Sequence, residues 1–189
     1  MGTKKATDIL MEEHREIERM LDVVDRAARR VERGEPVPPR LFVDAAIFFR
    51  NFADRCHHGK EEKHLFRRME ERGIAVEGGP LGVMYADHEQ GRTYVCLIQA
   101  EGQKYAEGGL QSPDLLVGAV RSYVNLLRQH ILKEDRILYP MGNQVLTSED
   151  QSALIEDCER VEREEMGEGE HERFHAMIGE LERQMAPQQ

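Results

Sequence analysis

Residues 57–66 read HHGKEEKHLF, and residues 130–139 read HILKEDRILY. Each segment starts with a histidine, has a glutamate four residues later and a second acid directly after it, and ends in a pair of large apolar or aromatic residues. Side chains four residues apart lie on one face of an α-helix. Each segment therefore predicts a helix that presents an imidazole and a carboxylate side by side, and the internal repeat predicts two such helices.

Apolar residues at steps of three and four continue these faces in both directions and define two further ones. The four faces are Leu10, Ile17, Leu21, Val24, Ala28 and Val31; Phe42, Ala46, Phe49, Ala53, Leu65 and Met69; Leu81, Met84, Val95 and Ile98; and Leu116, Tyr123, Leu127, Ile137 or Leu138, and Met141. Glycines and prolines in residues 34–39, 73–80 and 108–113 separate them. Four helices of comparable length with short connections predict an all-α, up-and-down antiparallel four-helix bundle.

We expect the bundle to occupy residues 1–147 and a C-terminal helical extension, packed on or beside it, to occupy residues 148–189. Candidate helix starts and breaks are Thr7 or Asp8 for the first helix, Arg40 for the second, Pro80 for the third, Ser112 with Pro113 for the fourth, and Gly167 with Gly169 inside the extension.

The composition agrees with packed amphipathic helices, because 40% of the 189 residues are hydrophobic, 33% are charged and none is tryptophan. A formal net charge of -10 argues against a nucleic-acid or anionic-membrane partner, since phosphate binding needs an excess of Lys and Arg. No segment resembles a signal peptide or a membrane span. The three cysteines are scattered and form neither a disulfide framework nor a thiolate zinc motif. We therefore expect a cytoplasmic protein.

Polar residues interrupt all four apolar faces. They are His14 on the first, His57 and Glu61 on the second, His88 on the third, and His130 and Glu134 on the fourth. Counted at about 1.5 Å per residue from the expected helix ends, they fall at overlapping heights in an antiparallel bundle. Burying so many imidazoles and carboxylates together is costly unless a shared positive charge compensates them, and a metal centre does so.

The residue types restrict the metal. Imidazole and carboxylate ligands without thiolate suit iron, manganese or zinc, whereas magnesium and calcium prefer oxygen alone. Four histidines with two glutamates are too many for one catalytic zinc ion but suit two ions bridged by carboxylates. Ferritin-like diiron bundles use the order Glu-x-x-His, whereas this chain has His-x-x-x-Glu, which points to another family.

The segments EEHREIERML, HHGKEEKHLF, DHEQGR and HILKEDRILYP resemble the successive helices of hemerythrin-like (HHE cation-binding) proteins over roughly residues 7–141. The resemblance implies a diiron centre with an oxo or hydroxo bridge, held by the six polar residues above, with Glu61 and Glu134 as carboxylate bridges. It also implies a small ligand such as dioxygen, peroxide or nitric oxide, without choosing among them and without deciding whether the protein is an enzyme.

Two positions depart from the pattern of the oxygen-carrying members. The oxygen carriers have a second histidine four residues after the one on the third helix, and this chain has Arg92 there. They also have an aspartate five residues after the last histidine. That position is Asp135 in this chain, so Glu134 and Asp135 compete for one role. Candidate replacements for the lost imidazole are His58, His64, His171 and His175. A sensor, stress or redox-handling protein is therefore favoured over a reversible oxygen carrier.

Other interpretations are an iron or zinc sensor or storage protein that acts through an unidentified protein partner, and a structural bundle without metal. The segment HERFH at residues 171–175 matches the HExxH zinc-protease motif, but no well-spaced third ligand follows beyond Glu180 and Glu182. We therefore do not favour a protease.

Overall fold

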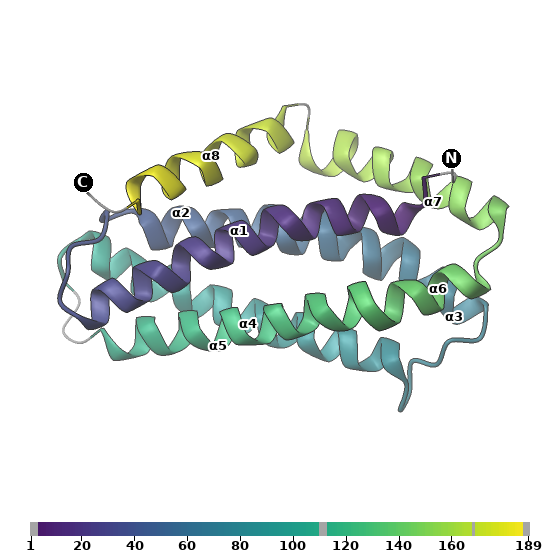
Figure 1. Ribbon diagram of the computed structural model, residues 1–189, viewed down its shortest axis with the longest axis horizontal. Helices are drawn as coiled ribbons and strands as arrows, with labels where there is room; N and C mark the ends of the chain where they lie inside the picture. The colour runs from purple at the N-terminus through teal and green to yellow at the C-terminus, as the bar shows by residue number, and fades with distance from the viewer. Residues whose placement is uncertain (1–3, 110–112, 168, 187–189) are drawn as a thin grey trace.

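The computed structural model describes residues 4–109, 113–167 and 169–186, and every regular element in these ranges is helical. The elements of the bundle are α1 (Ala6–Glu32); α2 (Leu41–Phe48), η1 (Phe49–His58), η2 (Glu61–Leu65) and α3 (Phe66–Glu71); α4 (Pro80–Ala106); and α5 (Asp114–Lys133), η3 (Glu134–Leu138) and α6 (Tyr139–Val145). They run as four antiparallel helical stretches, with α1 against α5 and α4 against both α2 and α5 (Figure 1). The predicted antiparallel bundle is confirmed.

Most predicted helix ends lie within a few residues of the observed ones. α4 begins at Pro80 as expected, and α2 begins one residue after Arg40. α1 begins at Ala6, so Thr7 is already inside the helix, and its hydroxyl accepts a hydrogen bond from Asn143 Nδ2 at 2.9 Å instead of capping. Ser112 lies outside the described residues, and α5 begins directly after Pro113.

The core consists of two apolar clusters, one toward each end of the bundle, and the polar residues lie between them. Leu10 belongs to one cluster and Ile17 to the other, with His14 between them on α1. On α4, Met84 and Val95 are divided in the same way around His88. The helix faces therefore place the polar residues at one level, as the heights estimated from the sequence required.

The helices that carry the repeated segment widen locally into π-helical turns, namely η1, η2 and η3. π-turns are often found at functional sites. Glu134 is followed four residues later by Leu138, which is 2% exposed, whereas Ile137 is 57% exposed. Of the two residues expected as alternatives at this position of the apolar face, Leu138 therefore occupies it and Ile137 does not.

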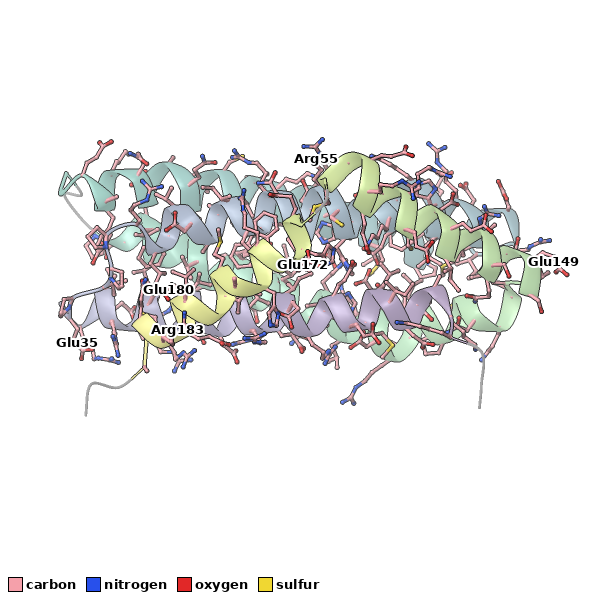
Figure 2. The ribbon with its side chains drawn as sticks, turned by 90° about the horizontal axis from the view of Figure 1, so that it is seen from above. Glu35, Arg55, Glu149, Glu172, Glu180 and Arg183 are labelled. Carbon is pink, nitrogen blue, oxygen red and sulfur yellow. The ribbon has the colours of Figure 1, made fainter. Side chains whose placement is uncertain are left out.

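The C-terminal segment consists of α7 (Ser148–Val161), η4 (Glu162–Met166) and α8 (Glu170–Gln184). The predicted break is confirmed, because Gly167 and Gly169 have φ values of +99° and +83°, which other residues rarely adopt. Both helices pack against α1. Figure 2 shows the segment along the outside of the bundle, with Glu149 near one end and Glu180 near the other.

No helix in the described part of the chain combines the length and the apolar character needed to cross a membrane.

Candidate metal centre

Seven buried side chains meet between the two apolar clusters. They are the six residues that the helix faces predicted and His58, which was expected only as a candidate to replace the imidazole that is absent at Arg92. They form two groups, in each of which the potential ligand atoms lie within 4.8 Å of one another: His58, Glu61, His88 and His130 in one, and His14, His57 and Glu134 in the other. All seven are at most 4% exposed.

The two glutamates lie between the groups. Glu61 Oε2 is 3.7 Å from His57 Nε2 in one group and 3.5 Å from His88 Nε2 in the other. Glu134 Oε2 is 3.3 Å from His14 Nε2 and 3.1 Å from His130 Nε2. Each carboxylate thus contacts imidazoles of both groups, which is the arrangement expected of bridging ligands.

Every imidazole in the centre is held from outside by a carboxylate at Nδ1. The pairs are His14 with Asp135 at 2.7 Å, His57 with Glu13 at 2.9 Å, His58 with Asp54 at 3.3 Å, His88 with Glu62 at 2.6 Å, and His130 with Asp87 at 3.3 Å. An ionised carboxylate only accepts hydrogen bonds, so in each pair Nδ1 donates, and a neutral ring keeps its lone pair on Nε2. Such carboxylate–histidine pairs orient imidazoles that ligate metals.

The inner atoms, by contrast, have no hydrogen-bond partner among the described residues. These atoms are His57 Nε2, Glu61 Oε2 and both carboxylate oxygens of Glu134. Leaving a buried polar atom unpaired costs on the order of 1–3 kcal/mol, and more if it is charged. His88 Nε2 and His130 Nε2 also face each other at 3.0 Å, so one of the two nitrogens must carry a proton unless cations take up both lone pairs. Shared cations would satisfy all of these atoms, so the donor set fits a metal centre.

The electrostatics of the centre favour a bound cation. Burial, and then repulsion from Glu134, raise the pKa of Glu61 well above its ordinary value, and a nearby cation would favour its ionised form. Burial lowers the pKa of His57 to about 4 and that of His88 to about 2, which keeps both rings in the neutral form that binds metal. Burial alone would lower the pKa of His130, but the charge of Glu134 raises it to about 9.

A family model described as the hemerythrin HHE cation binding domain matches residues 5–142. The chain belongs to this family. It is also 22% identical over 180 residues to uncharacterized proteins of Mycobacterium tuberculosis and Mycobacterium bovis, covering 95% of this chain and 70% of theirs. No solved structure gives a significant match. The cation-binding family and the buried His/Glu groups thus agree on a site able to hold metal ions.

The departure of this HHE domain from the oxygen carriers at Arg92 has a structural counterpart. Arg92 Nε donates to Asp54 Oδ1 at 2.8 Å, and Arg92 Nη2 donates to Glu62 Oε1 at 2.7 Å. These are the carboxylates that hold His58 and His88. The guanidinium therefore contacts the surroundings of the centre and not its interior.

Glu134 and Asp135 lie in different places relative to the imidazoles of the centre. Glu134 is fully buried among the imidazoles, whereas Asp135 holds His14 Nδ1 and also pairs with Arg15. The geometry thus assigns Glu134, and not Asp135, to the interior of this HHE site.

The three other candidate histidines point elsewhere. His64 Nδ1 lies 3.3 Å from Asp157, and His175, whose side chain is 66% exposed, lies 3.1 Å from Glu16. His171 forms a third group with Glu13 and Cys56, outside the paired centre. Because His171 and His175 meet different carboxylates, the HExxH segment forms no common site in the described structure.

Sequence reasoning missed the outer shell of this HHE centre. It did not identify Glu13, Asp54, Glu62 and Asp87 as histidine partners, although three of them are adjacent in sequence to a predicted site residue. It also missed Tyr139, whose hydroxyl donates to Glu61 Oε1 at 2.7 Å and whose ring stacks on His14. A tyrosine at an apolar position carried no separate signal.

Proposed function

We propose that this HHE domain is a non-haem diiron protein that binds or handles a small oxidant, such as dioxygen, peroxide or nitric oxide, in a stress, redox or sensing role. The proposed ligands are His14, His57, Glu61, His88, His130 and Glu134. One observation carries the proposal: the outer nitrogens of the imidazoles are occupied by carboxylates, while the inner atoms of His57, Glu61 and Glu134 have no partner among the described residues. Two cations bound in the bundle interior would supply that partner.

The choice of iron rests on the donor set. Both groups consist of imidazole and carboxylate, without sulfur, which suits iron, manganese or zinc. Two carboxylates that each contact imidazoles of both groups suit a pair of ions. Zinc has no redox chemistry, so iron and manganese, but not zinc, can exchange electrons with a small oxidant in such a site, and of these two we propose iron.

A pair of ferrous ions would supply the electrons for reduction of a small oxidant. The chain's own part is to hold and shield the site. Tyr139 binds Glu61 Oε1 and leaves Oε2 directed at the imidazoles, and Phe66 stacks against His88 and covers it from one apolar cluster. Burial limits the access of water and so favours small, weakly hydrated ligands.

Metal analysis of protein produced with ample iron tests the proposal. We expect about two iron ions per chain, the number that a carboxylate-bridged pair requires, and a visible absorption band when oxygen reaches the anaerobic ferrous protein. His130→Ala should lower the metal content and the melting temperature, because loss of a ligand removes binding free energy that also stabilises the fold.

The matched control is His175→Ala, which removes an exposed histidine outside the centre and should change neither quantity. Fewer than one ion per chain in the wild type would contradict the proposal. Two zinc ions and no absorption band would favour the alternative below.

A metal sensor or storage protein acting through a partner is the second candidate, and the C-terminal segment favours it. Glu13 holds His57, and buried Lys60 pairs with both Glu13 and Glu162 of η4. A change in the metal centre could reach the surface along these contacts. Faster proteolysis of the segment in the metal-free protein than in the loaded protein would support this role.

A further inference from the structure

The chain lacks the helix-three imidazole that oxygen-carrying members of the family have at the position of Arg92. We propose that His58 supplies this missing imidazole from the second helix, and that Arg92 has become a positioning residue that holds His58 and His88 in place. The inference rests on the proposed two-metal centre and concerns which residues of this chain complete it.

His58 has the position of a ligand. It is 4% exposed and belongs to the group of Glu61, His88 and His130. Its ring stacks on that of His88, with centroids 3.8 Å apart and planes 13° from parallel, and it meets His130 edge-on at 5.7 Å. Asp54 occupies Nδ1 of His58, which leaves Nε2 for the centre.

His57 and His58 are adjacent in sequence but serve different groups. Neighbouring residues on a helix point about 100° apart, so one of two consecutive side chains normally leaves a buried site. Both are buried here, because the pair ends the π-helical η1, which lies against helices on two sides. The second helix can thus contribute an imidazole to each group.

Arg92 connects the partners of two imidazoles. Its guanidinium donates to Asp54, the partner of His58, and to Glu62, the partner of His88. The planar fork of an arginine suits two carboxylates at once, which a lysine could not hold in the same geometry. Arg92 therefore orients the two carboxylates that hold His58 and His88.

None of the other candidate histidines has this geometry. His64, His171 and His175 have Asp157, Glu13 and Glu16 as their nearest carboxylates, and none of the three belongs to either group of the centre.

The first experiment counts metal ions. We expect His58→Ala to lower the iron content from about two ions per chain to about one, with helical circular dichroism unchanged. His58→Gln, which preserves more of the side-chain volume, repeats the measurement if the alanine variant folds poorly. His64→Ala is the matched control on the same helical stretch, and it should retain two ions. Two ions in the folded His58 variants would overturn the proposal.

The second experiment exchanges the two positions. Residue 92 lies one turn after His88 on the same helix face, so a histidine placed there can approach the same group. The double variant His58→Ala/Arg92→His should recover the second ion that His58→Ala loses. A folded double variant with only one ion would overturn the exchange of ligands between the two positions.

The third experiment tests the positioning role. Arg92→Lys keeps the charge but loses the fork, and it should weaken binding of the second ion by about 10–100-fold while the count at saturating iron stays at two. An unchanged affinity would overturn this role. These results are distinct from failure of the proposed function, in which the wild type itself would bind fewer than one ion.

Discussion

At the scale of single residues, four of the five acids that hold imidazoles of the centre lie on a different helix from their histidine, and Asp54 lies on the same element as His58. Glu13 directly precedes His14 in the sequence, yet it holds His57. Asp87 directly precedes His88, yet it holds His130. Consecutive side chains on a helix diverge by about 100°, so an acid next to an inward-facing histidine points toward the adjoining helix. In the sequence pairs Glu13–His14 and Asp87–His88, the acid therefore contacts a histidine on a different helix from the one that carries the pair.

Asp150 provides a residue-scale prediction of pH dependence. It lies at the start of α7 in a capping box with Thr147 and accepts hydrogen bonds from Arg72 at 2.8 and 3.1 Å. The side-chain hydrogen bonds from Arg72, and then the backbone N–H of Thr147, lower the pKa of Asp150 to about 2. Its ordinary pKa is about 3.9. A depressed carboxyl pKa stabilises the folded state above the unfolded value, and this contribution is lost as the pH falls toward the folded value.

We therefore expect Asp150→Asn to destabilise the protein at pH 6, and the difference from wild type to shrink between about pH 4 and about pH 2. Urea unfolding across this range measures it. Glu156→Gln, on an exposed acid of the same helix, serves as the control. A difference that stayed constant down to pH 2 would show that the charge of Asp150 contributes nothing.

At the scale of helices, π-turns and close contacts decide how the faces meet. The widened turns contain His57, His58 and Glu61 on the second stretch and Glu134 on the fourth. None lies on α1 or α4, which carry one histidine each in the centre. A helix that must direct two or three residues into one site gains from the extra width. The hydrophobic period alone cannot reveal such a turn, because apolar residues on either side still recur at three or four.

Gly102 provides the prediction at this scale. A Cβ added there would lie 2.8 Å from Phe42 Cβ and 3.3 Å from the Phe42 carbonyl carbon, because α4 passes close to α2. Overpacking against backbone typically costs about 1–3 kcal/mol, more than the roughly 1 kcal/mol that alanine gains over glycine in a helix. We expect Gly102→Ala to lower the free energy of unfolding measured with urea.

The control is Gly118→Ala on α5, where an added Cβ meets nothing within 4 Å. That variant should be more stable than wild type by about 0.5–1 kcal/mol. If both variants were stabilised equally, α2 and α4 would not need the glycine at their contact.

At the scale of the whole molecule, we propose that the C-terminal extension is a unit that can open without unfolding the bundle. Phe174 of α8 is buried and packs edge-on against Phe48 and Phe52 at centroid distances of 5.8 and 6.1 Å. The connection to η4 passes through Gly167 and Gly169, where an added Cβ would meet only Glu170 Cγ, at 3.9 Å from Gly167, and nothing within 4 Å at Gly169. Regions with few buried contacts open locally at a lower free energy than the core.

Phe174→Ala should therefore loosen α8 first. Removing a buried phenylalanine typically costs about 3–5 kcal/mol. We expect cleavage between η4 and α8 by a dilute protease to become at least about tenfold faster, since that is the effect of about 1.4 kcal/mol on the opening equilibrium. The iron content of the bundle should stay the same.

Glu172→Ala changes an exposed residue of the same helix, labelled in Figure 2, and should leave the cleavage rate near that of wild type. Equal rates for the two variants, or loss of iron together with faster cleavage, would mean that extension and bundle open as one unit.

The sequence by itself determined the helical class, the four apolar faces, the break near Gly167 and the level at which polar residues interrupt the core. Those properties depend on local periodicity and on turn residues, which each helix carries independently. The convergence of His14, His57, Glu61, His88, His130 and Glu134 followed from the same faces.

Only the tertiary structure decided which acid holds which imidazole, that Glu134 and not Asp135 faces inward, and that His58 joins the centre while Arg92 contacts its partners. These outcomes depend on how far each helix is rotated about its axis and on the π-turns that change this rotation. A shift of one residue moves a side chain by about 100°, which spacing along the chain does not specify. Contacts between helices therefore had to be observed in three dimensions.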